Sequence, residues 1–179
     1  MKSTNIVGAD GKRRELDFYP TPPEVTMALC EWMKERGMRM QSVWEPACGD
    51  GRMVRMLEQY FDQVVGTDIQ QGTDFLTAEK PDGIEWIITN PPFSLAEQFI
   101  RKAAECNVPF AMLLKSQYWH SARRKKLFDE IRPSHILPLT WRPDFTGKGS
   151  SLLDMQWSVW IPNDSYTTYF QPLEKPYRR

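Results

Sequence analysis

The chain has 179 residues, of which 41% are hydrophobic and 12% aromatic, so it can bury the core of one compact domain, and wholesale disorder and fibrous repeats are excluded. Its 23 Lys and Arg balance its 23 Asp and Glu, and this zero net charge by itself disfavours a nucleic-acid partner. No apolar run is long enough to span a membrane, and none follows the N-terminus as in a secretory signal, which predicts a cytoplasmic protein without a membrane segment.

Helical and strand-like patterns alternate along residues 17–162. Thr21 and Glu24 form a capping box that predicts a helix beginning at Thr21, and Gly37 predicts its end. The following patterns predict helices at 52–60, 94–105 and 120–131, and strands at 42–44, 64–69, 84–90, 108–116, 134–140 and 155–162. This alternation predicts an α/β fold with a single doubly wound, mostly parallel sheet, whose last two strands can form a hairpin. Residues 1–16 are expected to form a flexible arm, and residues 163–179 a C-terminal tail that packs or frays.

The first predicted strand is followed by the turn E-P-A-C-G-D-G at 45–51. Ligands of open parallel sheets bind outside the carboxyl ends of the strands, so this turn is a candidate site. Its glycines allow a tight turn that approaches a ligand, with a helix N-terminus directly behind it. The turn matches neither G-x-G-x-x-G nor G-x-x-x-x-G-K-[ST], which disfavours a dinucleotide and a nucleoside triphosphate. Taken alone, it could also be a plain strand-to-helix connection.

Two further candidates follow predicted strands. Asp68 ends the second strand, where a carboxylate can accept hydrogen bonds from both hydroxyls of a ribose or can cap a turn. The segment Asn90-Pro91-Pro92-Phe93 follows the strand at 84–90, and its prolines fix the backbone. The Asn90 amide oxygen and the Pro91 carbonyl can then accept both protons of an exocyclic NH2 group, while Phe93 offers a flat face to its planar ring.

Positive charge is concentrated in residues 115–148, which hold eight Lys and Arg against three Asp and Glu. Aromatic residues of this stretch could stack on bases, and its R-R-K-K run could contact phosphates. The structural alternatives are half-buried aromatic residues and the solvated face of a helix. A glycine-rich loop at 141–151 predicts a clamp facing the target. The candidate target contacts are Tyr118, Trp119, Arg123, Arg124 and Lys148.

The cysteines and histidines show no spacing typical of a disulfide framework or a metal site. Cys30, Cys48 and Cys106 are an odd number without a C-x-x-C pair, which argues against a disulfide framework and a zinc site. We interpret them as small core residues. His120 and His135 show no metal-ligand spacing with these cysteines, so the sequence predicts no metal site.

Five motifs in fixed order resemble those of S-adenosylmethionine-dependent amino-methyltransferases, most closely the DNA N6-adenine group and its small phage or prophage members. They are Y-P-T-P at 19–22, E-P-A-C-G-D-G at 45–51, G-T-D-I at 66–69, D-F-L at 74–76 and N-P-P-F at 90–93. The resemblance covers residues 17–162 and implies a methyltransferase domain with a seven-stranded, Rossmann-like sheet whose last strand is antiparallel. It implies that S-adenosylmethionine is held by Tyr19, Thr21, Pro22, Glu45, Pro46, Ala47, Cys48, Gly49, Asp68, Ile69, Asp74, Phe75 and Asn90. It implies that the target base is held by Asn90, Pro91, Pro92 and Phe93.

The activity implied by this resemblance is transfer of a methyl group to N6 of adenine in DNA, with the base flipped out of the duplex. Sequence-specific members carry a large target-recognition domain that this chain lacks, so a partner for target recognition is expected. Only residues 70–73 separate Ile69 from Asp74, which leaves no room for the helix that normally lies there. N-P-P-[FY] chemistry also suits a protein glutamine amide or an RNA base, and a non-catalytic DNA- and cofactor-binding module is a further alternative. The Y-P-T-P segment and the basic stretch favour DNA, and the intact N-P-P-F favours an enzyme.

Overall fold

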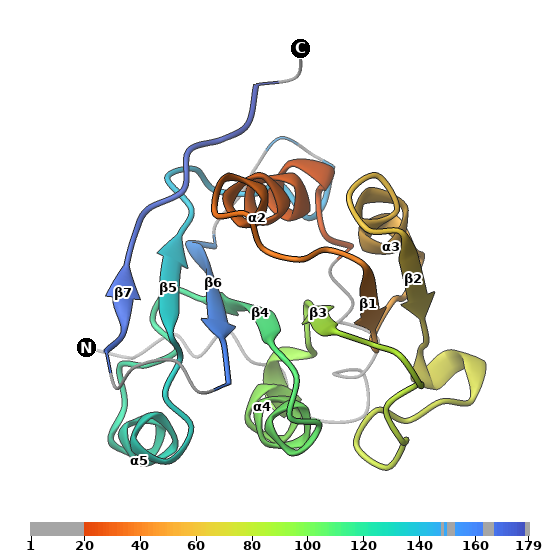
Figure 1. Ribbon diagram of the computed structural model, residues 1–179. Coiled ribbons are helices and arrows are strands. Elements are labelled where there is room, and N and C mark those ends of the chain that lie inside the picture. Colours follow the sequence, from red (N-terminus) through yellow and green to blue (C-terminus); the bar gives the residue numbers. More distant parts are fainter. Residues whose placement is uncertain (1–19, 148, 150–152, 163–166, 178–179) are drawn as a thin grey trace.

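The computed structural model describes residues 20–147, 149, 153–162 and 167–177 (Figure 1). In this part of the chain the helices are α2 (Pro23–Glu35), α3 (Arg52–Leu57), α4 (Ala96–Glu105) and α5 (Ala122–Glu130), with 3-10 helices η1 (Ile69–Gln71) and η2 (Phe93–Leu95). The strands are β1 (Ser42–Glu45), β2 (Gln63–Gly66), β3 (Trp86–Thr89), β4 (Phe110–Lys115), β5 (His135–Pro138), β6 (Met155–Trp160) and β7 (Tyr169–Phe170). Every predicted helix and strand is confirmed, with ends that shift by a few residues.

The seven strands form one sheet in the order β2-β1-β3-β4-β6-β5-β7, which confirms the predicted seven-stranded, mostly parallel architecture. Strands β2, β1, β3 and β4 run parallel, and Trp44 in the middle of β1 aligns with Val65 of β2 and Ile87 of β3. Strand β6 runs antiparallel to both β4 and β5, as predicted for the last strand of the domain. Because β1 lies between β2 and β3, the residues that follow these three strands meet at one edge of the sheet.

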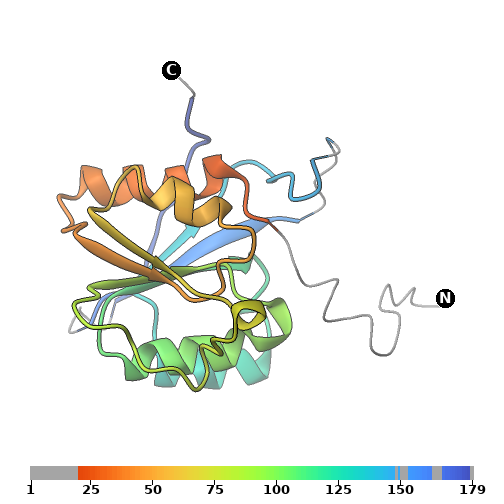
Figure 2. The same ribbon diagram turned by 90° about the vertical axis from the view of Figure 1, so that its right-hand side faces the viewer.

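Helices cover both faces of the sheet, α2 and α3 on one face and α4 and α5 on the other (Figures 1 and 2). Side chains of a strand alternate between its two faces. In β4, Leu113 belongs to the core cluster with α2 and α3, whereas Met112 and Leu114 belong to the cluster with α4 and α5. The side-chain N–H of Trp157 in β6 donates to the carbonyl of Val25 in α2 (3.0 Å), which joins one layer to the sheet. These two covered faces confirm the doubly wound fold.

Helix α2 begins differently from the sequence prediction. Pro22 is the N-cap residue, Pro23 is the first helical residue, and no side chain of a described residue caps the helix. The predicted capping box of Thr21 and Glu24 is therefore wrong. Neither proline has a backbone N–H, so this helix start has fewer donors that a cap could satisfy. The Thr21 hydroxyl is consequently available to another part of the chain.

The seventh strand comes from the tail. Tyr169 and Phe170 pair in parallel with β5, and Leu173 forms a further bridge to Leu139. At the opposite edge, β2 has no outer neighbour among the described residues. The reason is the short connection after β2, where η1 is followed by a turn at Asp74, whose carbonyl accepts from the backbone N–H of Ala78 (2.8 Å). The tail thus supplies an edge strand on the far side of the sheet.

None of the described helices is both long and apolar enough to cross a membrane. Among the residues that the structure describes, no group of three or more His, Cys, Asp or Glu side chains could hold a metal ion. Cys30, Cys48 and Cys106 are free thiols, of which Cys30 is buried and the other two are half-buried.

Candidate active site

A buried carboxyl group joins the carboxyl ends of β1 and β3. Glu45, the last residue of β1, is 1% exposed, and its Oε1 accepts hydrogen bonds from Thr89 Oγ1 (2.6 Å) and from the backbone N–H of Ala47 (3.0 Å). Burial raises the pKa of Glu45 to about 8, although both hydrogen bonds act in the opposite direction. A cation bound beside this carboxyl group would favour its charged form. The bond to Thr89 links Glu45 to the residue that precedes Asn90.

Asp68 fastens the turn after β1 to the end of β2. Its Oδ2 accepts from the backbone N–H of Gly49 (2.9 Å), and its Oδ1 accepts from that of Gln70 (2.8 Å). The carboxylate therefore caps η1, and the residue is 8% exposed. Gly49 and Gly51 have φ angles of 48° and 77°, which other residues rarely adopt. The glycines of this turn thus serve its backbone geometry, and Asp68 holds that geometry in place.

The residues after Asp68 border the carboxyl edge of the sheet. Ile69 is 69% exposed, and such an apolar side chain suits a contact with a planar ring. Asp74 Oδ1 accepts the backbone N–H of the residue two positions later (3.0 Å). The side chain of Phe75 lies in the core: it is 2% exposed, with ring centroids 5.1 Å from Trp44 and 4.8 Å from Phe99. The side chain of Phe75 is therefore not accessible to a ligand.

Cys48 lies in the turn after β1 between two carboxyl groups. Burial raises the pKa of its thiol, and the negative charges of Glu45 and Asp68 raise it further. Its Sγ accepts a long hydrogen bond from Gln71 Nε2 (3.8 Å). Cys48 is therefore protonated at neutral pH and has none of the thiolate character of a nucleophilic cysteine.

The segment from Asn90 to Phe93 leads from the end of β3 to helix α4. Asn90 Nδ2 donates a hydrogen bond to Thr21 Oγ1 (3.0 Å), which joins the segment to the start of α2. Pro91 is buried, and Pro92 directly precedes η2. Two consecutive prolines and this bond restrict the backbone and the Asn90 amide together. The predicted target-binding segment is thus a rigid part of the fold at the carboxyl edge of the sheet.

Lys115 is a further candidate site residue, which the sequence analysis counted in the basic stretch but did not name as a target contact. It ends β4, and its ammonium nitrogen lies 4.4 Å from the centroid of the Phe93 ring. Lys115 is half-buried and forms no ion pair with any described residue. The nearby carboxylate of Asp154, which precedes β6, binds Arg142 instead (2.8 Å). The available signal was a single lysine at the end of an otherwise apolar strand.

Most of the described Lys and Arg side chains of the basic stretch form ion pairs within the protein. Glu97 of α4 forms ion pairs with Arg101 (3.2 Å), Arg123 (2.9 Å) and Arg124 (2.8 Å). These arginines lower the pKa of Glu97 despite its partial burial. Arg124 also lies over the ring of Tyr118, with its Cζ 4.3 Å from the centroid. The Arg124 side chain is 22% exposed and that of Arg123 is 77% exposed, so Arg123 is the more accessible of the two.

Trp119, another predicted target contact, has interaction partners within the fold. The Trp119 side chain donates its N–H to Ser158 Oγ (3.3 Å) and packs edge-on against Tyr118 and Phe128. Lys148, a predicted target contact, and Tyr19, a predicted cofactor contact, lie outside the described residues. In the predicted clamp, Phe145 is 7% exposed and belongs to the core, which anchors the first half of this loop.

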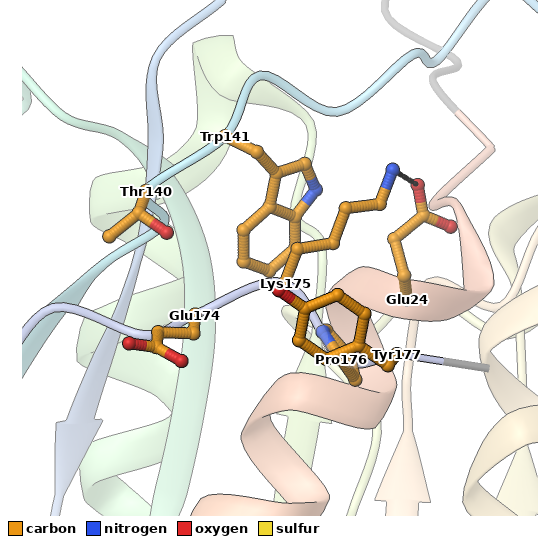
Figure 3. Close-up of a pocket in the computed structure, with 7 residues that line it drawn as sticks. All are labelled: Glu24, Thr140, Trp141, Glu174, Lys175, Pro176 and Tyr177. Atoms are coloured by element: carbon orange, nitrogen blue, oxygen red, sulfur yellow. Dashed lines mark ion pairs between the residues drawn. The ribbon is translucent and has the colours of Figure 1, made fainter. Parts of the chain in front are cut away.

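An open cavity of about 850 Å³ lies between the first turn of α2, the residues after β5 and the tail (Figure 3). Lys175 and Glu24 form an ion pair across it (3.7 Å). Its described lining consists of Glu24, Thr140, Trp141, Glu174, Lys175, Pro176 and Tyr177. Trp141 belongs to the predicted clamp at 141–151, and Asp68 and Asn90 are not among the lining residues.

No protein-family model matches the chain, and no curated protein matches its sequence. Solved structures do match. A candidate class I S-adenosylmethionine-dependent methyltransferase from Listeria monocytogenes is 13% identical with a TM-score of 0.62, over 88% of this chain and 67% of that one. The methyltransferase subunit of a type I restriction-modification system from Streptococcus thermophilus is 14% identical with a TM-score of 0.65, over 86% of this chain and 47% of that one. The chain has the class I methyltransferase fold.

A candidate RNA methyltransferase from Pyrococcus horikoshii shares the fold as well, with 12% identity and a TM-score of 0.60 over 87% of this chain and all of that one. At these identities the likeness concerns the fold alone. The chain spans about half the length of the restriction-modification subunit. Cofactor, target and target atom therefore have to be argued from the site itself.

Proposed function

We propose that the protein transfers the methyl group of S-adenosylmethionine to N6 of adenine in DNA. The observation that carries this proposal is the rigid Asn90-Pro91-Pro92-Phe93 segment at the end of β3, beside Glu45 and next to Lys115. A side-chain amide oxygen, a backbone carbonyl and an aromatic face suit a planar ring with an exocyclic NH2 group.

The residues at the ends of β1 and β2 fit this cofactor. The Asp68 carboxylate, the exposed Ile69 and Asp74 suit the two ribose hydroxyls and the purine of an adenosine. Glu45 offers a carboxyl group of raised pKa to the cationic methionine end, together with the turn at 46–49 and Pro22. When bound, S-adenosylmethionine supplies an electrophilic methyl group on a sulfonium.

The protein's own residues contribute mainly by position. Asn90 and Pro91 would accept the two protons of the target NH2 group, which turns the nitrogen lone pair toward the methyl group, and Phe93 would hold the ring. Alignment of this kind converts a bimolecular step into an intramolecular one. The nitrogen loses its proton after transfer, so the site needs no strong base. Cys48, a thiol at neutral pH, takes no part in this step.

Lys115 favours a nucleic acid over a protein amide as the target. A half-buried cation without a carboxylate partner among the described residues favours an anionic substrate. Beside Phe93, such a charge suits a phosphate of the flipped nucleotide, whereas a glutamine side chain brings no charge of its own. We propose that Lys115 contacts this phosphate, and that target recognition beyond the flipped nucleotide requires a partner.

Replacing Asp68 by alanine is expected to weaken S-adenosylmethionine binding by about 1.5–3 kcal/mol, the scale of a charge-assisted hydrogen bond. The same change removes two backbone contacts of the turn, so thermal stability falls as well. Calorimetric titration of the cofactor measures the effect. Asp62→Ala, an exposed aspartate just before β2 at the opposite edge, is the matched control. Unchanged affinity in folded Asp68→Ala would remove Asp68 from the cofactor site.

Replacing Lys115 by methionine is expected to weaken DNA binding about tenfold and to lower the slope of log affinity against log salt by about 1. The loss of one phosphate contact causes both effects. Fluorescence anisotropy between about 50 and 200 mM salt measures them. Lys34→Met, near the C-terminal end of α2, is expected to leave both values unchanged. An unchanged salt slope in Lys115→Met would exclude the phosphate contact.

The proposed activity is tested by offering labelled S-adenosylmethionine to DNA, RNA and a cell-protein extract in parallel. We expect label in the DNA, since the site combines the proposed base-binding segment with a lysine that forms no ion pair with a described residue. Label in protein only would support a glutamine amide as the target instead. Cofactor binding without label in any pool, also after addition of a cell extract that could supply a partner, would identify a non-catalytic module.

A further inference from the structure

Thr21 has an unusual place for a residue in front of a helix. It is 5% exposed, and its hydroxyl oxygen accepts the hydrogen bond from Asn90 Nδ2 at 3.0 Å, although 69 positions separate the two residues. Its sequence context, Thr-x-x-Glu, is that of a helix cap. Helix α2 nevertheless has no side-chain cap. A capping threonine typically adds to helix stability, so this hydroxyl serves the Asn90 amide instead of the helix.

The backbone around Thr21 is unusually restricted. Pro20 precedes it, and Pro22 and Pro23 follow it. Proline fixes its own φ angle and limits the residue in front of it, and a β-branched side chain has few χ1 rotamers. The Thr21 hydroxyl is thus held in one place before any ligand binds. Such preorganisation is what a positioning group requires.

The asparagine amide has two chemically different ends on one rotatable bond. The nitrogen donates and the oxygen accepts, so a half-turn about this bond exchanges their positions. Binding of the target NH2 group needs the oxygen on the target side. The bond from Nδ2 to Thr21 occupies the nitrogen end and so selects this orientation.

We propose that Thr21 is a positioning residue that orients the Asn90 amide toward the target nitrogen. This inference rests on the proposed function, because it assumes that Asn90 binds the amino group that is methylated. It differs from a cofactor-binding role for Thr21: a positioning residue changes the rate of transfer, whereas a cofactor ligand changes the affinity for S-adenosylmethionine.

Three variants test the proposal. Thr21→Val removes the hydroxyl at nearly constant shape and is expected to lower kcat about 10- to 100-fold, with KM values within about twofold, because small misplacements at the reacting centre cost this much. Thr21→Ser keeps the hydroxyl and is expected to retain most of the activity. Thr26→Val is the control: Thr26 is fully buried in helix α2, which follows Thr21, and its hydroxyl has no hydrogen-bond partner in the described part of the chain.

A second measurement is independent of activity. The side-chain NH2 resonances of Asn90 in a ¹⁵N-labelled sample are identified by their loss in Asn90→Ala. In Thr21→Val these resonances are expected to shift and to exchange faster with solvent, whereas Thr26→Val leaves them in place. Unchanged resonances in Thr21→Val, or weaker cofactor binding at constant kcat, would overturn the proposal. If the wild-type protein transferred methyl groups to no substrate, the proposed function would fail, and the resonances would still decide whether Thr21 orients Asn90.

Discussion

Replacement of Asn90 by alanine is expected to reduce methyl transfer about 100- to 1,000-fold, the cost of removing one preorganised hydrogen-bonding group from a transition state. The target nitrogen loses an acceptor that aligns its lone pair. Binding of S-adenosylmethionine is expected to stay within about twofold, because Glu45 and Asp68 remain, and a twofold change is well below the energy of one hydrogen bond. Single-turnover transfer and calorimetric titration measure the two quantities separately.

The matched control for this variant is Asn107→Gly. Asn107 follows α4 with a φ angle of 52°, a conformation that glycine adopts without strain. This control is expected to keep both activity and cofactor affinity. An equal loss of transfer and cofactor affinity in Asn90→Ala would show that Asn90 belongs to the cofactor pocket, and full activity would exclude it from the site.

Glu45 is expected to make the ligand-free protein less stable as pH rises. Burial raises its pKa from 4.5 to about 8, so between these values the folded state holds a proton that the unfolded state releases. Its stabilising contribution is therefore complete below about pH 4.5 and is lost as pH rises through 8. The shift corresponds to a loss of about 2–5 kcal/mol in the free energy of unfolding. Urea denaturation at a series of pH values measures it.

Glu45→Gln isolates this effect. The glutamine oxygen can still accept from Thr89 and Ala47, but the side chain has no charge. The variant is expected to lack this pH-dependent loss and to be more stable than the wild type above about pH 8. Equal pH dependence in both proteins would show that Glu45 is ionised throughout, stabilised by a contact other than these two hydrogen bonds.

Local patterns were sufficient to predict the order of helices and strands. The continuous apolar run of β4 reflects burial on both faces of the sheet, whereas the amphipathic pattern of α4 reflects burial on one face of the helix. Both patterns are visible in short stretches of sequence. The position of the candidate site followed from the same reasoning, since Glu45 ends β1 and Asp68 and Asn90 closely follow β2 and β3.

Contacts between distant residues could not be predicted in this way. The sequence around Thr21 favours a local cap, and only the folded chain brings Asn90 within hydrogen-bond distance of its hydroxyl. Phe75 lies in a motif associated with the cofactor, yet its ring fills the core. Arg124 belongs to a charge run, but Glu97 from another helix binds it. In each case the deciding partner lies far away along the sequence.

The tail illustrates the same limit. Tyr169 and Phe170 are too short a run to predict a strand, and their pairing depends on the exposed edge that β5 offers. At the other edge, the short connection after β2 was visible in the sequence, because four residues cannot hold a helix of ordinary length.

Nucleoside analysis by mass spectrometry, on DNA incubated with S-adenosylmethionine and either the wild-type protein or Asn90→Ala, tests the central claim most directly. N6-methyldeoxyadenosine that forms with the wild type and is largely lost with Asn90→Ala is the predicted result. A methyl group found on another base, or an equal yield of N6-methyldeoxyadenosine from both proteins, would contradict the assignment of the Asn90-Pro91-Pro92-Phe93 segment as the adenine site.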